Sequence, residues 1–231
     1  MRRGKRTLVF ICTIAMLIAS TGMVFAEETE VLPAGSMENF IRSLVYEDQF
    51  ADVADTAWYS QHVKDAYEYG FVSGNTENTY SPDNEVTIAE ALVIACRLHS
   101  IYYDAEIELS LEDGDPWYQP YVDYALENGI LERELDEYDR PISRGGFLEI
   151  FYRALPESAY AEINQIPDGA IPDVEADSAL GAKVYAFYRA GILTGYTAYS
   201  FGADSEITRA EMATIMNRMF DSSARQRFSI P

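Results

Sequence analysis

The sequence predicts an all-α fold in which three copies of one helix-loop-helix unit pack on one another in a single domain. Three observations predict it: an internal repeat, an apolar periodicity of about 3.6 residues in each copy, and matching signals at the helix ends. Two short amphipathic helices cannot bury their apolar faces alone, so we expect the three copies to share one core.

The repeat is clearest between the first and last copies, because residues 50–98 align with residues 171–219 at a constant offset of 121 positions. A more divergent middle copy follows at an offset of 59, which places Trp58 on Trp117. After a three-residue deletion in the loop, an offset of 56 places Thr87 on Ser143. We therefore predict units 1, 2 and 3 at residues 50–102, 111–156 and 166–220.

Each unit begins with an amphipathic helix that ends at a glycine. Apolar residues recur at i, i+3 and i+4 and the glycine follows at i+7, which is typical of a helix with a left-handed C-terminal cap. The three stripes end at Gly70, Gly129 and Gly191. A second stripe in each unit predicts a second helix, as at Ala91, Ile94, Ala95 and Leu98.

The second helices of units 1 and 3 begin with a capping box. Thr87 and Thr208 are each followed three positions later by a glutamate, which predicts reciprocal hydrogen bonds between hydroxyl, carboxylate and backbone. Ser143 keeps the hydroxyl in unit 2, but Gly146 replaces the glutamate. We therefore expect unit 2 to fray most easily at this helix start.

The segments outside the units suggest export. Residues 1–26 resemble a cleaved signal peptide, with a basic start, an apolar stretch and Val24-Phe25-Ala26 before the cleavage point. The alternative is a retained membrane anchor, since the apolar stretch approaches the length that spans a bilayer. Residues 27–49 are expected to hold a short helix at 37–45, and residues 221–231 form a polar tail.

The charge limits the partners. Removal of the signal would leave 13 basic against 38 acidic residues, a net charge of −25. Such a surface repels nucleic acid and anionic lipid, so any anionic ligand needs a local positive pocket. Only Cys96 would remain, which excludes an internal disulfide. No stretch has metal-ligand spacing, and we expect neither a metal nor another cofactor.

Two arginines break a local rule. Arg144 and Arg209 directly follow the caps Ser143 and Thr208, in the first helical turn, where the helix dipole disfavours a cation. The hydroxyl, the free N–H groups and the guanidinium would together form a corner for a carboxylate or a phosphate. The alternative is an ion pair with an acidic residue of a neighbouring unit. Ile88 takes this position in unit 1.

These motifs carry a family resemblance. The string from Phe50-Ala-Asp-Val53 through Trp58 and Gly70 to Thr87-Ile-Ala-Glu90, with its echo ending in Ile207-Thr-Arg-Ala-Glu211, resembles the S-layer homology domain over about residues 48 to 220. The resemblance implies that the three units form a pseudo-threefold bundle at a bacterial cell surface or cell wall. It also implies non-covalent binding of secondary cell-wall polymers, often with pyruvylated sugars, in grooves between the units.

The resemblance also implies roles for individual residues. Arg144 and Arg209 would meet the acidic group of the sugar, beside the hydroxyls of Ser143 and Thr208. Trp58 and Trp117 would lie against a sugar face or, alternatively, plug the core. Asp52 and Asp173 would accept sugar hydroxyls or, alternatively, cap their own turns. The departures are Ile88 for arginine, Ala179 for tryptophan and Gly145-Gly146 for Ala-Glu, so no unit carries the whole set.

Three classes of function follow. The leading prediction is a non-catalytic surface module that binds a bacterial cell-wall polysaccharide and anchors itself or another surface protein. The alternative is an interaction or assembly protein that has kept the fold and lost the glycan site. An enzyme is the weakest hypothesis, because His62 and His99 lack metal-ligand spacing and nothing places two carboxylates across a cleft. We expect no contact with nucleic acid, and none with a membrane once the signal is cleaved.

Overall fold

The computed structural model describes residues 35–195 and 200–230. The predicted signal peptide at 1–26 and the start of the following segment lie outside the described residues. Within the described ranges the regular elements are helices, and the remaining ladder contacts are isolated bridges. The prediction of an all-α fold is therefore confirmed.

Each predicted unit contains two α-helices. They are α1 (Ser60–Glu68) and α2 (Ile88–Tyr103) in unit 1, α3 (Gln119–Glu127) and α4 (Arg144–Arg153) in unit 2, and α5 (Ala179–Arg189) and α6 (Arg209–Phe220) in unit 3. Short 3-10 helices are present at η1 (Met37–Asn39), η2 (Glu157–Ala159) and η3 (Ser222–Ala224). All six predicted α-helices are thus present.

The signals at the helix ends act as the sequence indicates. Gly70, Gly129 and Gly191 follow α1, α3 and α5 with φ of 74°, 68° and 73°, which is the left-handed region. Both predicted capping boxes are formed, at the starts of α2 and α6. At the start of α4 only the hydroxyl of Ser143 caps the helix, by accepting from the N–H of Gly146 at 3.2 Å.

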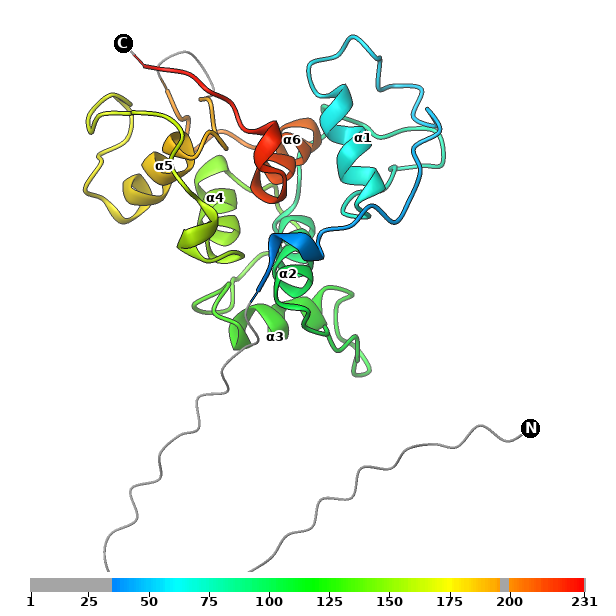
Figure 1. Ribbon diagram of the computed structural model, residues 1–231. Helices are drawn as coiled ribbons and strands as arrows, with labels where there is room; N and C mark the ends of the chain where they lie inside the picture. The colour runs from blue at the N-terminus through cyan, green and yellow to red at the C-terminus, as the bar shows by residue number, and fades with distance from the viewer. Residues whose placement is uncertain (1–34, 196–199, 231) are drawn as a thin grey trace, which may run out of the picture. The chain divides into compact units, whose positions relative to one another are not determined.

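The helices that pack together come from different units. Helix α1 packs on α6, α3 packs on α2, and α5 packs on α4, as Figure 1 shows. The first helix of each unit therefore lies against the second helix of the unit before it, with unit 3 counting as the one before unit 1. Because each helix pair needs two units, the three units fold together around one apolar core, which includes Leu92, Phe147 and Met216.

A ring of backbone hydrogen bonds links the starts of the second helices. The N–H of Val86 donates to Ile207 O at 3.0 Å, that of Ile207 to Ile142 O at 3.2 Å, and that of Ile142 to Val86 O at 2.8 Å. The three bonds close a circle with one residue from each unit. These backbone hydrogen bonds follow the pseudo-threefold arrangement of the units.

The first residue of each second helix also forms a backbone hydrogen bond to the loop of the next unit. The backbone N–H of Ile88 donates to Arg140 O, that of Arg144 to Ser205 O and that of Arg209 to Asn84 O, at 3.0, 2.8 and 2.9 Å. The residue after each cap is therefore fixed at a junction between two units.

The helix expected at 37–45 is wrong in extent, because only η1 forms there. The following residues are held by the C-terminal end of α1: the N–H groups of Ser43 and Leu44 both donate to Glu68 O, and Arg42 pairs with Asp65 and Glu68. These contacts replace the i to i−4 bonds that a helix would need.

Candidate functional site: a groove drawn from three units

A groove lies beside the exposed Trp58, and we call it the Trp58 groove. Its volume is about 260 Å³. Its lining residues are Trp58, Arg144, Leu193, Thr194, Gly195, Glu211, Thr214, Ile215 and Arg218. The tryptophan comes from unit 1, Arg144 comes from unit 2 and the rest come from unit 3, so the groove exists only where three units meet.

Trp58 offers an aromatic face to this groove. Its side chain is 64% exposed, and it meets Tyr59 edge-on with ring centroids 5.3 Å apart. Trp117 is 54% exposed and meets Tyr118 in the same way. An indole in this position can cover the apolar face of a sugar ring, whereas neither tryptophan plugs the core.

Arg144 forms one wall of the groove and is held by the protein itself. Its Nε donates to Phe201 O at 3.0 Å, its Nη1 pairs with Glu211 Oε1 at 3.1 Å, and its guanidinium lies over the Phe201 ring. Only 4% of the residue is exposed. Arg144 therefore contributes mainly to the junction between units 2 and 3, as the ion-pair alternative predicted.

Arg209 has a related position at the junction between units 3 and 1. Its Nε donates to Tyr80 O at 2.9 Å, its Nη2 donates to Ser73 O at 2.8 Å, and its guanidinium lies over the Tyr80 ring. It forms no ion pair with an acidic residue among the described residues, and it is only half-buried. More of its donor capacity is available to a ligand than that of Arg144.

The predicted hydroxyls and carboxylates already have backbone partners. Asp52 accepts from the N–H groups of Tyr80 and Ser81 at 2.8 and 2.7 Å, and Asp173 accepts from those of Phe201 and Gly202 at 2.9 and 2.8 Å. Each aspartate thus holds a loop 28 or 29 residues further along the chain. The hydroxyls of Ser143 and Thr208 accept from helical N–H groups.

Arg218 is the groove residue that the sequence reasoning missed. Its Nη1 donates to Ile192 O at 3.2 Å, and its Nε is buried without a hydrogen-bond partner among the described residues. Burial lowers the pKa of Arg218 to about 10, so the side chain still carries its charge at neutral pH. A signal was available, because the repeat offset of 121 places Arg97 on Arg218.

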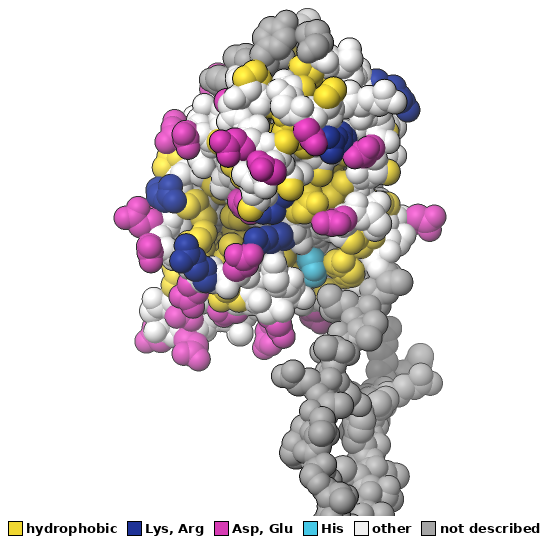
Figure 2. Space-filling view, turned by 90° about the vertical axis from the view of Figure 1, so that its left-hand side faces the viewer, with side chains coloured by type: hydrophobic (Ala, Val, Ile, Leu, Met, Phe, Trp, Pro, Cys, Tyr) yellow, Lys and Arg dark blue, Asp and Glu magenta, His cyan; other side chains and the backbone are white. Residues whose placement is uncertain are grey.

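Arg218 places a desolvated positive charge in the groove of a strongly acidic protein. Acidic side chains spread across the face shown in Figure 2, and several basic side chains lie among apolar ones near its middle. The whole chain carries a net charge of −21. Arg218 has no carboxylate partner among the described residues, so an anionic ligand in the Trp58 groove would restore the balance of charge.

The three departures from the repeat pattern can be assigned to a single groove if every groove is built from the three units in the same order. If each groove takes tryptophan from one unit, arginine from the next and glutamate from the third, then Trp58, Arg144 and Glu211 form one set. The same register assigns Trp117, Arg209 and Glu90 to a second set. The third set would be Ala179, Ile88 and Gly146, so all three substitutions fall on a single groove.

Two structural features of the described ranges bear on other functions. No helix in residues 35–195 or 200–230 combines the length and apolarity that crossing a membrane requires. The same ranges contain no group of three or more His, Cys, Asp or Glu residues placed to hold a metal ion.

Comparison with known proteins points to one family. The model of the S-layer homology domain matches residues 49–92 and 170–213, which lie largely in units 1 and 3. An endoglucanase from Bacillus sp. (strain KSM-635) is 29% identical over 82 residues, which is 36% of this chain and 9% of that protein. The chain therefore matches a small part of that relative.

Proposed function

We propose that this protein, whose chain contains S-layer homology domains, binds an acidic cell-wall polysaccharide in the Trp58 groove. S-layer homology domains are binding modules that anchor proteins to the cell wall, which associates the chain with the cell surface. The finer proposal concerns the ligand: a sugar stacks on Trp58 while its acidic group meets Arg218. The observation that carries it is the charged Arg218, which is desolvated without a carboxylate partner among the described residues.

The chemistry of the groove fits one acidic sugar unit. An exposed indole attracts the apolar face of a sugar ring, and a guanidinium donates two parallel hydrogen bonds to a carboxylate. The exposed Thr194 lines the same groove and offers its hydroxyl to a ring substituent, whereas the buried hydroxyl of Thr214 already donates to Ala210 O at 2.8 Å. Since the protein surface is strongly acidic, long-range attraction to an anionic polymer is absent, and binding depends on these local contacts.

Arg144 supports this site from behind. Its ion pair with Glu211 keeps the carboxylate away from the ligand, and it fixes the helix start that forms the wall. An Arg144 variant would therefore lose binding and stability together. Variants of the more exposed Trp58 and Arg218 separate the two effects more cleanly.

The test is sedimentation with purified cell walls of the source bacterium, before and after the polymer is stripped. The wild-type chain is expected to sediment only with unstripped walls. The double variant Trp58→Ala, Arg218→Gln should lose at least tenfold in apparent affinity, because it removes both the stacking face and the charge. Arg227→Gln, which makes the same charge change in the tail, should bind as the wild type does.

Two outcomes would contradict the proposal. Wild-type sedimentation that persists with stripped walls excludes the polymer as the ligand. Unchanged binding of the double variant, with helical circular dichroism intact, excludes the Trp58 groove. If the wild type fails to bind walls yet elutes with a stoichiometric protein partner, the alternative of a protein interaction module takes its place.

A further inference from the structure

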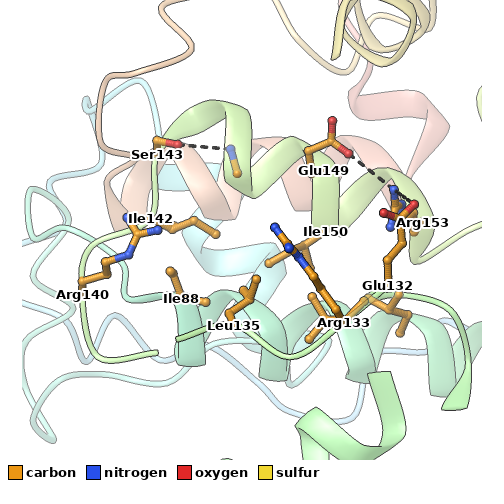
Figure 3. A pocket seen from close by; sticks show the side chains of 13 residues that line it. Ile88, Glu132, Arg133, Leu135, Arg140, Ile142, Ser143, Glu149, Ile150 and Arg153 are labelled. Carbon is orange, nitrogen blue, oxygen red and sulfur yellow. Dashed lines mark hydrogen bonds and ion pairs between the residues drawn. The ribbon is translucent and has the colours of Figure 1, made fainter. Parts of the chain in front are cut away.

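The Trp58 groove has a counterpart between units 1 and 2, where the equivalent arginine is neutralised. This counterpart is a pocket of about 300 Å³, drawn in Figure 3. Arg153, which the repeat offsets place on Arg218, lies there beside Glu132 and Glu149. Its Nη2 is 2.6 Å from Glu132 Oε1 and 3.7 Å from Glu149 Oε2. The positive charge of the arginine in unit 2 is therefore paired with two carboxylates.

The Trp58 groove lacks both of these carboxylates. Thr194 and Thr214 take the positions of the two glutamates, and both line the groove. A threonine carries no charge, so neither one offsets the guanidinium of Arg218. The remaining acidic residue of the lining, Glu211, pairs with Arg144 at 3.1 Å. The charge of Arg218 is thus left without a carboxylate in the described lining of its groove.

A histidine replaces a lysine beside this arginine. Next to the pocket of Figure 3, Lys183 donates to Glu149 Oε2 at 2.5 Å. The offset of 121 places Lys183 on His62, which lies in α1, the helix that packs on α6. A lysine at this position would add a second permanent charge near Arg218, whereas an imidazole can lose its charge close to neutral pH.

The contacts of His62 fit its neutral form. Asn217 Nδ2 lies 3.0 Å from His62 Nδ1 and 3.1 Å from Asp65 Oδ2. An amide nitrogen only donates, so Nδ1 accepts and the ring hydrogen is on Nε2. Asn217 is 1% exposed, and its Oδ1 has no hydrogen-bond partner in the described part of the chain. If the amide turns over, this oxygen can accept from the Nδ1–H of a protonated ring.

The surroundings of His62 oppose its protonation. Burial lowers the pKa of His62 below its ordinary value of 6.5, and the charge of Arg218 from α6 lowers it further. Asp65, on the same helix as His62, raises the pKa. Its carboxylate is already paired with Arg42 at 2.7 Å, and Arg42 also pairs with Glu68. An anion that binds Arg218 would remove part of the opposition to a proton on His62.

We propose that His62 is a proton-dependent second cation of the Trp58 groove, and that a bound anion and a proton on His62 favour each other. The inference rests on the proposed function, because the anion is the acidic group that meets Arg218. Since this anion offsets the charge of Arg218, the complex holds a proton on His62 more tightly than the free protein does. By linkage, the affinity for the anion should rise as the pH falls below about 6.5.

The binding test compares sedimentation with unstripped cell walls at about pH 5.5 and about pH 7.5, on either side of the ordinary pKa of histidine. The wild-type chain should bind at least about threefold more tightly at the lower pH. His62→Gln keeps an acceptor for Asn217 and gains no proton, so this rise should disappear. His99→Gln, the matching change of the other histidine, should keep the rise, because the pKa of His99 is about 4.

A second measurement needs no ligand. The chain has two histidines, so NMR spectroscopy can follow both imidazoles as the pH is lowered, and His62→Gln identifies the signal that belongs to His62. The variant Arg218→Gln should raise the pKa of His62 and leave that of His99 unchanged. An unchanged pKa of His62 would show that the two side chains are not coupled, and would overturn the inference.

The two proposals fail in different ways. Wild-type binding of equal strength at both pH values, or the same rise in His62→Gln, overturns the role of His62 and leaves the proposed function intact. If the wild type does not bind unstripped walls at either pH, the proposed function fails and the linkage that rests on it falls as well. Loss of the rise in His62→Gln alone, together with the raised pKa in Arg218→Gln, supports the inference.

Discussion

The pair formed by Arg144 and Glu211 tests how the units hold together. We would replace Arg144 with Ile and Glu211 with Gln, singly and together. The first change copies the natural Ile88 of the equivalent junction. The second removes the charge of Glu211 and keeps an oxygen that can accept from the N–H of Thr208, as the glutamate does now at 3.0 Å.

The contacts set the magnitudes. Arg144→Ile removes the Nε bond to Phe201 O and the ion pair, and a buried pair that loses one partner costs about 3–5 kcal/mol. Because the Glu211 side chain is still 21% exposed, we expect a loss near the low end, about 3 kcal/mol. Glu211→Gln removes the carboxylate that faces the buried Arg144 and should cost about 2 kcal/mol.

The double variant tests whether the two side chains stabilise each other. With both charges gone, the free energy of unfolding should fall by about 3–4 kcal/mol, less than the sum of the single losses, which gives a coupling energy of about 1–2 kcal/mol. The assay is urea denaturation followed by helical circular dichroism. A coupling below about 0.5 kcal/mol would show that the pair does not bind the two units. Arg144→Ile combined with Glu90→Gln, the matching glutamate of unit 1, is the additive control.

Two further predictions concern the helix start of unit 2 and a buried histidine. Native-state hydrogen exchange can compare the amide of Gly146, whose helix start is capped by Ser143 alone, with the amides of Glu90 and Glu211 in the two complete capping boxes. The Gly146 amide should exchange about fivefold faster, because one capping interaction is worth about 1 kcal/mol. Equal protection of the three amides would contradict this. Burial lowers the pKa of His99 to about 4, below its unfolded value near 6.5. The contribution of the neutral imidazole to the free energy of unfolding is therefore fully present above pH 6.5. It should be lost as the pH drops towards 4, by up to about 3 kcal/mol. His99→Gln should show a shallower loss between pH 6.5 and 4 in urea midpoints, and an unchanged slope would refute the assignment.

Local signals predicted the helices well. The stripes ending at Gly70 and Gly191, and the capping boxes at Thr87 and Thr208, depend on neighbours within a few residues, so the sequence contains all the information they need. The helix expected at 37–45 shows the limit of such signals. The backbone N–H groups of Ser43 and Leu44 donate to Glu68 O, more than twenty residues away, and no local sequence pattern predicts that contact.

The candidate site was harder to predict because its residues come from different units. The sequence pattern, read unit by unit, suggests that no complete set survives. In the structure, Trp58 and Arg144 line the same groove as Glu211, although they belong to three different units. The roles of Asp52 and Asp173 depend likewise on contacts 28 or 29 residues away, which fix loops and leave little capacity for sugar hydroxyls.

The closed ring of units explains why one groove can change while the others keep their sets. A single solenoid-like stack would leave its terminal units without neighbours, whereas here Val86, Ile142 and Ile207 give every unit two neighbours. Substitution of a pair such as Ile88 and Gly146 therefore alters one junction, and the hydrogen-bonded circle is kept by the backbone alone. The fold can thus carry grooves with different side chains in one chain, because the side chains that line a groove are separate from the backbone bonds that close the ring.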